Sequence, residues 1–280
     1  MPVDHKRING PEESVPYELF ARLSGLTSEK AFEQLYKAGK RSDGREFEEH
    51  RKIFLKNGAV SQAKGSAYIE MGQTKVIVSV FDPREIPNRS DYSLKGELYC
   101  EFKFAPFSCA KRRLHQQDNE EKQYSCIMKK ALESAVCLHE LPNFQVDIYA
   151  LVMHNDGSAL SAAITAAGVA LVEAGVPMYD IITSVTVGIQ QGVKLVDPDS
   201  LEEQMCQVQF LSEKYQDNNH GLLIISKLHT QEQLCQFYQN GYVSLEVLKS
   251  GLEVLSKTCE VIVPLVQKCL IKHITNGIKS

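Results

Sequence analysis

The residues most able to do chemistry lie in a short loop, Asn155-Asp156-Gly157-Ser158-Ala159-Leu160. Small residues between a strand and a helix favour anion binding, because free N–H groups and the positive dipole end of the helix face the ligand. A phosphate that takes part in a reaction normally also needs an Arg or Lys, and the last two positions of this loop are Ala159 and Leu160. We therefore predict the geometry of a phosphate site without the side chain that grips phosphate.

Two elements that the sequence predicts clearly must position this loop. Residues 144–153 are rich in β-branched and aromatic side chains with period-two alternation, which is typical of a strand. Residues 158–173 form an almost unbroken apolar run that stops before Gly175 and Pro177, which predicts a buried helix. We expect the side chain of Asp156 or Ser158 to cap the first turn of this helix.

The composition limits the class of protein. The 280 residues are 43% hydrophobic with a formal net charge of −4, so the chain can fill a core but lacks the charge excess of non-specific nucleic-acid binders. Its eight cysteines include no C-x-x-C pair and its eight histidines have no ligand spacing, which favours reduced thiols in an intracellular protein. No apolar run reaches membrane-spanning length, so we expect a soluble chain with no membrane partner, metal or cofactor.

The chain divides into a short first part and one larger unit. Residues 1–40 are expected to form an N-terminal tail with short helices, because residues 1–17 are polar with turn formers and residues 18–40 have helical spacing. Residues 41–280 are expected to form a single domain.

Within that domain, a run of strands followed by helices occurs twice. In the first half we expect strands at residues 53–60, 65–71, 74–80, 97–105 and 144–153, with helices at 121–138 and 158–173. In the second half we expect strands at residues 182–190, 193–196, 207–211 and 222–226, with helices at 231–238 and 245–274. This order predicts an α+β fold with two pseudo-equivalent βα halves packed as one domain.

An ordered series of motifs resembles the RNase PH-like family over roughly residues 41–270. The motifs are Arg41-Ser42-Asp43-Gly44-Arg45, residues 65–76, residues 82–85, residues 131–136 and residues 174–180. Residues 1–14, 195–198 and 201–203 narrow the resemblance to ring subunits of the RNA exosome. The resemblance implies a six-subunit ring of paired RNase PH-like chains, S1/KH-type cap subunits on that ring, and a separate attached nuclease that performs the hydrolysis.

The same resemblance indicates that the catalytic residues are lost. Active members carry a phosphate-binding Arg at the position that is Leu160 here, and an RNA-contacting Arg pair at the position of Asn119-Glu120. The first of two downstream acids is retained as Glu203, whereas the second falls on Gln207-Val208-Gln209. We therefore interpret Asp156 to Leu160 and Glu203 as former active-site positions, with Glu203 a solvated charge, and predict that the chain is not an enzyme.

Five basic residues are candidates for RNA contact. Arg89 matches a family Arg that lines the neck of the ring's pore. Lys111-Arg112-Arg113, together with Lys103, forms a basic cluster that can contact phosphates with a salt-dependent benefit. The alternative for each of them is an ordinary solvated charge.

These observations predict a non-catalytic ring subunit that supports 3′-to-5′ RNA processing and degradation and helps line the RNA path. The resemblance implies a location in the nucleus, nucleolus and cytoplasm. One alternative is a divergent phosphorolytic 3′-to-5′ exoribonuclease acting as a homo-oligomer, and another is an unrelated α+β protein that binds a small anion at residues 156–158. Residues 97–104 and 222–226 are candidate sheet edges for neighbouring subunits.

Overall fold

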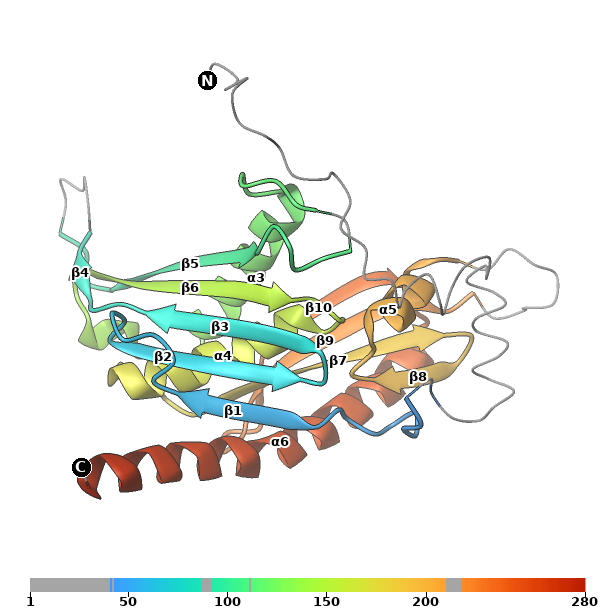
Figure 1. Cartoon of the computed structure of the whole chain (residues 1–280). Helices are drawn as coiled ribbons and strands as arrows, with labels where there is room; N and C mark the ends of the chain where they lie inside the picture. Colours follow the sequence, from blue (N-terminus) through green and yellow to red (C-terminus); the bar gives the residue numbers. More distant parts are fainter. Residues whose placement is uncertain (1–40, 42, 87–91, 111, 210–217, 280) are drawn as a thin grey trace, which may run out of the picture.

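The computed structural model describes residue 41 and residues 43–86, 92–110, 112–209 and 218–279 (Figure 1). The predicted tail and short helices of residues 1–40 lie outside the described residues. The candidate RNA contacts Arg89 and Lys111 lie outside them as well.

The first half of the chain forms a mixed sheet. Its antiparallel neighbours, in spatial order, are β1 (Ile53–Asn57), β2 (Gly65–Met71), β3 (Thr74–Val80) and β6 (Phe144–His154). On the other side of β6 lies β5 (Glu97–Phe104), which is parallel to it. The two-residue β4 (Arg84–Glu85) pairs with the start of β6, beyond the end of β3. The predicted hairpin is confirmed, and Gly72, with φ +60°, supplies the left-handed conformation of its turn.

Helices cover one face of this sheet. Helix α3 (Asn119–Glu133) packs on β5, and helix α4 (Ala159–Ala174) packs on β2 and β3. Strand β3 shows the period-two pattern, since Val76, Val78 and Val80 are fully buried while the residues between them are partly exposed. At Gly65 the backbones of β2 and α4 touch, because a Cβ there would collide with the carbonyl oxygen of Ala170.

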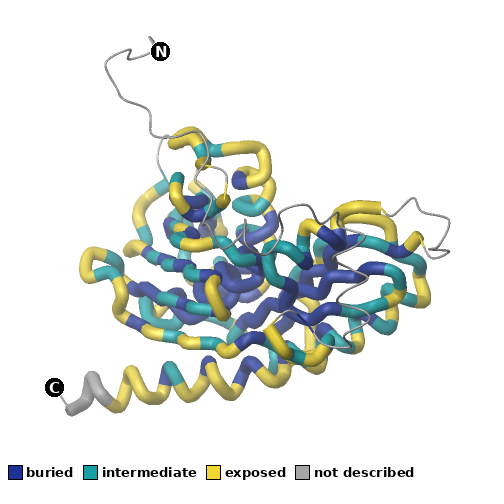
Figure 2. The backbone as a smooth tube through the Cα atoms, turned by 45° about the vertical axis from the view of Figure 1, so that its right-hand side comes forward, coloured by how far each residue is buried: buried dark blue, intermediate teal, exposed yellow. Residues whose placement is uncertain are grey.

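Helix α4 is the central layer of the molecule. Every residue from Ala159 to Leu171 is buried, because the helix packs against the first sheet and also against strand β7 (Ile182–Gln190) of a second sheet. Its seven alanines and single glycine permit this close approach, and a Cβ at Gly168 would lie only 2.6 Å from Cγ2 of Ile182. Figure 2 shows the continuous buried interior that results.

The second sheet is antiparallel, in the order β10–β9–β7–β8. Its other strands are β8 (Val193–Val196), β9 (His220–Leu228) and β10 (Gln233–Tyr242). Helix α4 and the short α5 (Ser200–Gln207) lie on one face, and the long α6 (Leu245–Lys279) crosses the other and continues beside β1 (Figure 1). All nine residues of β7 are therefore buried. The predicted α+β class is confirmed.

Two predictions for the second half are wrong. Residues 231–238, expected as a helix, fall largely within β10, which pairs with β9 from Gln233 to Tyr242. Pairing with a distant strand decides the conformation of this stretch, and its local pattern does not reveal that pairing. Gln207, expected to begin a strand over residues 207–211, is the last residue of α5, and residues 210–211 lie outside the described part.

The pairing also tests the two predicted sheet edges. Among the described strands β5 pairs only with β6, so the predicted edge at residues 97–104 is confirmed, with Tyr99 exposed and Phe102 buried. Residues 222–226 lie inside β9, between β7 and β10, so that predicted edge is wrong. Within the described residues, β8 and β10 form the edges of the second sheet.

Candidate functional site

The loop between β6 and α4 has an unusual backbone conformation. Gly157 (φ +83°) and Ser158 (φ +56°) are both left-handed. A Cβ on Gly157 would collide with the carbonyl oxygen of Pro198, so the loop lies directly against the turn that follows β8. This contact brings the end of the first sheet and the start of α5 together.

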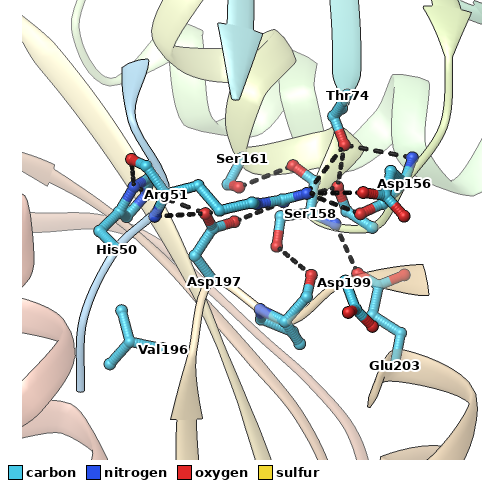
Figure 3. A network of polar contacts seen from close by, with 12 residues as sticks. His50, Arg51, Thr74, Asp156, Ser158, Ser161, Val196, Asp197, Asp199 and Glu203 are labelled. Atoms are coloured by element: carbon cyan, nitrogen blue, oxygen red, sulfur yellow. Dashed lines mark hydrogen bonds and ion pairs between the residues drawn. The ribbon is translucent and has the colours of Figure 1, made fainter. Parts of the chain in front are cut away.

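A buried arginine fixes the loop to the second half of the chain (Figure 3). The guanidinium of Arg51 donates to both carboxylate oxygens of Asp197, at 2.7 Å each, and to the carbonyl oxygens of Asp156 at 2.7 Å and Gly157 at 3.2 Å. The hydroxyl of Thr74 donates to the Gly157 carbonyl at 2.7 Å and accepts the Asp156 N–H at 3.2 Å. Internal contacts therefore hold the loop in place.

The Arg51–Asp197 pair is charged in the folded protein. Burial would raise the pKa of Asp197, but hydrogen bonds from Arg51 and the positive charges of His50 and Arg51 outweigh it and hold that pKa well below its usual range. Burial alone would lower the pKa of Arg51, yet the bonds to Asp197 raise it. Such a pair is structural, because removal of either partner leaves a buried charge unpaired.

The N-terminus of α4 already holds a carboxylate of the chain itself. The N–H of Ser158 donates to Oε1 of Glu203 at 2.7 Å (Figure 3). Burial, together with the negative charges of Asp197 and Asp199, raises the pKa of Glu203 to about 7 in spite of this hydrogen bond and the charge of Arg51. The expectation that Glu203 is a solvated charge is wrong, because α5 directs it into the position that a bound anion would take.

The predicted side-chain cap of α4 is not observed. Ser158 is the N-cap residue, but its side chain makes no capping hydrogen bond and its hydroxyl donates to the Pro198 carbonyl at 3.2 Å. Its left-handed backbone turns the side chain away from the first turn of the helix. The Asp156 carboxylate lies 3.5 Å from Nη1 of Arg51 and accepts the N–H of Ser200, and burial raises its pKa despite these contacts.

The other positions that were predicted to be a former active site carry no cationic side chain that could hold phosphate. Ala159 and Leu160 are buried in the main hydrophobic core, so the slot that the resemblance assigns to an Arg faces the interior. Residues 207–209 are exposed at and after the end of α5 and contain no carboxylate.

A second buried arginine sets the direction of α5. Arg41 donates to both oxygens of Glu202, with Nε–Oε1 at 2.9 Å, and to the carbonyl of Asp197 at 2.9 Å. Asp199 caps the helix by accepting the N–H groups of Leu201 and Glu202, and burial next to Glu202 raises its pKa. These contacts aim the next residue of the helix at the loop.

The sequence did not identify this network. Arg51 stands in none of the motifs, and Arg41, Thr74, Asp197 and Glu202 stand there only as members of family-like motifs. The two arginines lie 146 and 161 positions from their acidic partners, and no local pattern in a single sequence pairs residues at that distance.

Of the candidate RNA contacts, Arg113 is engaged within the chain. Its Nη2 donates to Glu120 at 2.8 Å, its Nη1 lies 3.6 Å from Asp118, and the guanidinium stands 4.1 Å from the centroid of the Phe104 ring. The acid at position 120 thus neutralises a neighbouring arginine.

The other described candidates lie nearby. The ammonium group of Lys103 donates to the carbonyl of His115 at 2.7 Å, and Arg112 is exposed. Arg112 is therefore the residue of this cluster, within the described part, with the greatest access to solvent.

All eight cysteines are free thiols, and Cys100, Cys137, Cys206 and Cys259 are buried. In the described part of the chain no three His, Cys, Asp or Glu side chains gather in a way that could hold a metal ion. No helix among those residues is both long and apolar enough to cross a membrane.

Comparison with known proteins gives consistent matches. Residues 49–177 match the model of domain 1 of the 3′ exoribonuclease (RNase PH) family. The chain is 38% identical to the human exosome complex component MTR3 over 219 residues, 73% of this chain and 75% of that protein. It is 31% identical to the mouse exosome complex component MTR3 over 293 residues, 97% of this chain and 96% of that protein.

A solved structure shows the same fold. It is a chain of the Archaeoglobus fulgidus exosome with RNA bound to the active site, with a TM-score of 0.71 and 21% identity. The match covers 85% of this chain and 96% of that one.

Proposed function

Because the chain belongs to the RNase PH family of 3′ exoribonucleases and is a homologue of the exosome component MTR3, we propose that it is a non-catalytic ring subunit. In this role it supports 3′-to-5′ RNA processing and degradation by holding other subunits and by lining the RNA path. The observation that carries the proposal is the Glu203 carboxylate at the N-terminus of α4, bonded to the N–H of Ser158.

Phosphorolysis requires a phosphate held in line with the terminal RNA linkage and stabilisation of the charge that develops. Here the anion position is taken by a carboxylate, and Leu160 places no cation beside it. Burial raises the pKa of Glu203 to about 7, and its carboxylate repels phosphate whenever it is ionised. In either protonation state the carboxyl group occupies the Ser158 N–H.

The alternative is a divergent phosphorolytic exoribonuclease that acts as a homo-oligomer. The test is to incubate the purified chain with 3′-end-labelled RNA and inorganic phosphate, alongside an active family member as positive control. We expect no phosphate-dependent release of nucleoside diphosphates. Release that depends on phosphate and comes from the chain alone would overturn the proposal.

The proposed partners are other RNase PH-like ring subunits, S1/KH-type cap subunits, an attached catalytic nuclease and RNA. Arg89 at the pore and Arg112, with the neighbouring Lys103 and Lys111, are the proposed RNA contacts. Native mass spectrometry of the tagged chain from its source cells tests the assembly. One copy among several different homologous chains supports the proposal, whereas a ring of identical chains favours the enzyme.

A further inference from the structure

The first sheet has one face that no helix covers. Helices α3 and α4 pack on one side of this sheet, and among the described elements no helix lies on the other (Figure 1). Three aromatic residues gather on the uncovered face: Phe81 just after β3, Tyr149 on β6 and Tyr99 on β5. The ring of Tyr149 lies between the other two, with centroids 5.7 Å from Phe81 and 6.0 Å from Tyr99. We call these three residues the aromatic patch.

The pairing of the strands places two carboxylates beside the aromatic patch. Asp147 pairs with Tyr99, and its carbonyl accepts the N–H of Phe81 at 3.0 Å. Glu101 pairs with Tyr149. Side chains of directly opposed residues point to the same face of a sheet, so both carboxylates lie on the face of the aromatic rings.

The aromatic patch is open to solvent. Phe81 is 37% exposed and Tyr99 is 44% exposed. Leu151, the next residue of β6 on the same face as Tyr149, is 38% exposed. Large apolar side chains that meet solvent side by side, rather than singly, are typical of an interaction surface.

The charged groups around the aromatic patch leave one carboxylate without a cation. Nε of Arg84 lies 2.8 Å from Oδ2 of Asp147, so these two charges offset each other. Glu101 forms no ion pair among the described residues. Lys103 lies two positions from Glu101 on the same face, and its ammonium group donates to the carbonyl of His115 at 2.7 Å.

The two tyrosines respond to this excess of negative charge. Burial and the charges of Glu101 and Asp147 raise the pKa of Tyr99. Burial and the charge of Asp147 raise the pKa of Tyr149 as well, against the opposing charge of Arg84. Negative charge therefore predominates at both rings, which favours a cationic group over them.

We propose that the aromatic patch binds a basic segment of a partner protein, with an Arg or Lys of that segment over the rings of Tyr99 and Tyr149 and close to Glu101. Aromatic faces attract cations, and the uncompensated carboxylate supplies the complementary charge. RNA is a poorer match, because its phosphates would meet Glu101 and Asp147. The inference does not depend on whether the chain is catalytic.

Photo-crosslinking in the source cells tests the proposal on the full chain. A benzoylphenylalanine at position 151 lies beside the aromatic patch and leaves its three residues intact. We expect it to crosslink to a partner peptide that contains an Arg or Lys, as mapped by mass spectrometry. The matched control position is Leu234, which is 54% exposed on β10 in the second sheet, and it should not crosslink to that peptide.

A neutral substitution shows whether charge holds the partner. Glu101→Gln keeps the size of the side chain and should lower the yield of the crosslink from position 151 about fivefold or more. Glu253→Gln removes an exposed carboxylate on α6 and should leave that yield unchanged.

A charge exchange gives a second readout once the crosslinked peptide is mapped. Glu101→Arg should abolish the crosslink, and replacement of the mapped basic residue of the partner by Glu should restore it. A crosslink that the exchange does not restore would overturn the pairing of Glu101 with that residue.

Other results would overturn the proposal as a whole. A crosslink to RNA would make the face a nucleic-acid surface, and one to residues 1–40 would make the chain its own occupant. A partner peptide without a basic residue, equal yields in Glu101→Gln and Glu253→Gln, or no crosslink from position 151 would each contradict it.

Discussion

At the residue scale, Glu203 combines two properties that oppose phosphate. Its carboxylate accepts the N–H of Ser158, and its side chain is long enough to do so from within α5. An Asp at this position would be one methylene shorter. The Glu203 carboxyl group therefore occupies the N-terminus of α4, where an anion would otherwise bind.

The raised pKa of Glu203 predicts a pH-dependent stability. Its folded-state pKa of about 7 exceeds the ordinary value of 4.5, so the folded protein binds the proton more tightly than the unfolded chain. Between these values the free energy of unfolding falls as the pH rises. In Glu203→Gln the amide oxygen still accepts the Ser158 N–H and this loss is absent.

Chemical denaturation at pH 4 and pH 8 measures this effect. We expect the free energy of unfolding of Glu203→Gln to exceed that of the unaltered chain by about 1–3 kcal/mol at pH 8 and to equal it at pH 4. Glu253→Gln, at an exposed position on α6, is the control and should show no such pH dependence. Equal stability of Glu203→Gln and the unaltered chain at pH 8 contradicts the prediction.

Restoring the missing arginine should fail. Leu160 lies in the core, so Leu160→Arg buries an unpaired guanidinium and should lower the free energy of unfolding by about 3–5 kcal/mol. The volume-conserving Leu160→Met should cost less than about 1.5 kcal/mol. Urea denaturation measures the change in the free energy of unfolding of both variants. A stable Leu160→Arg chain with phosphorolytic activity would contradict the prediction that position 160 cannot hold a catalytic arginine.

At the element scale, the close contact between β2 and α4 at Gly65 can be tested by substitution. Gly65→Ala places a methyl group against the backbone of α4 at Ala170 and Ala174, neither of which can move without shifting the central helix. We expect a loss of about 3 kcal/mol in the free energy of unfolding.

Gly251→Ala is the matched control for that substitution. The nearest atom to its new methyl group is the flexible end of Leu223, at 3.1 Å, and alanine favours the helix by about 1 kcal/mol. Thermal unfolding of the two variants should therefore show a large loss for the first and little change for the second. Similar melting temperatures would mean that α4 and β2 are packed less closely.

Elements with strong local patterns were predictable from the sequence. The strand and helix around the loop appear within a residue or two of their predicted bounds, because alternation and a long apolar run identify them. Strand β10 was not predictable, since its sequence mixes polar and apolar residues and its conformation comes from pairing with β9. The start of helix α5 was predictable as well, since Asp199 and Glu202 have the spacing of a capping box.

The site was less predictable than the elements. The small residues of the loop predict an anion site, and Leu160 is the basis for the prediction that the phosphate-binding arginine is lost. The orientation of the Glu203 side chain depends on the contact between Arg41 and Glu202, which are 161 residues apart in the sequence. Because no local pattern indicates that contact, the orientation could not be predicted.

At the scale of the whole molecule, Arg51 and Asp197 join the two halves. The folded-state pKa of Asp197 is lowered below its ordinary value of about 4. The stability that this pair contributes is therefore present above about pH 4 and is lost as the pH falls from there through the lowered folded-state pKa. Asp197→Asn should cost about 3–5 kcal/mol at pH 7, because it leaves the buried Arg51 without its partner.

Guanidinium denaturation at pH 7 and at acidic pH measures the cost. The control is Asp82→Asn, which removes an exposed pair with Lys64 at 3.5 Å and should cost less than about 1 kcal/mol. The difference in the free energy of unfolding between Asp197→Asn and the unaltered chain should become smaller as the pH is lowered. A difference that stays the same in acid contradicts a role for the Asp197 charge.

The same long-range pairs have a consequence while the chain is being synthesised. Arg41 and Arg51 precede their acidic partners by 161 and 146 residues. At about 5–20 residues per second, the partners are synthesised roughly 7–30 seconds after the arginines. The first sheet is complete only late in that interval, once β6 has been made, and α4 then still lacks the β7 strand that covers its second side. Until β7 has been made, the nascent first half therefore exposes the apolar second side of α4 to solvent.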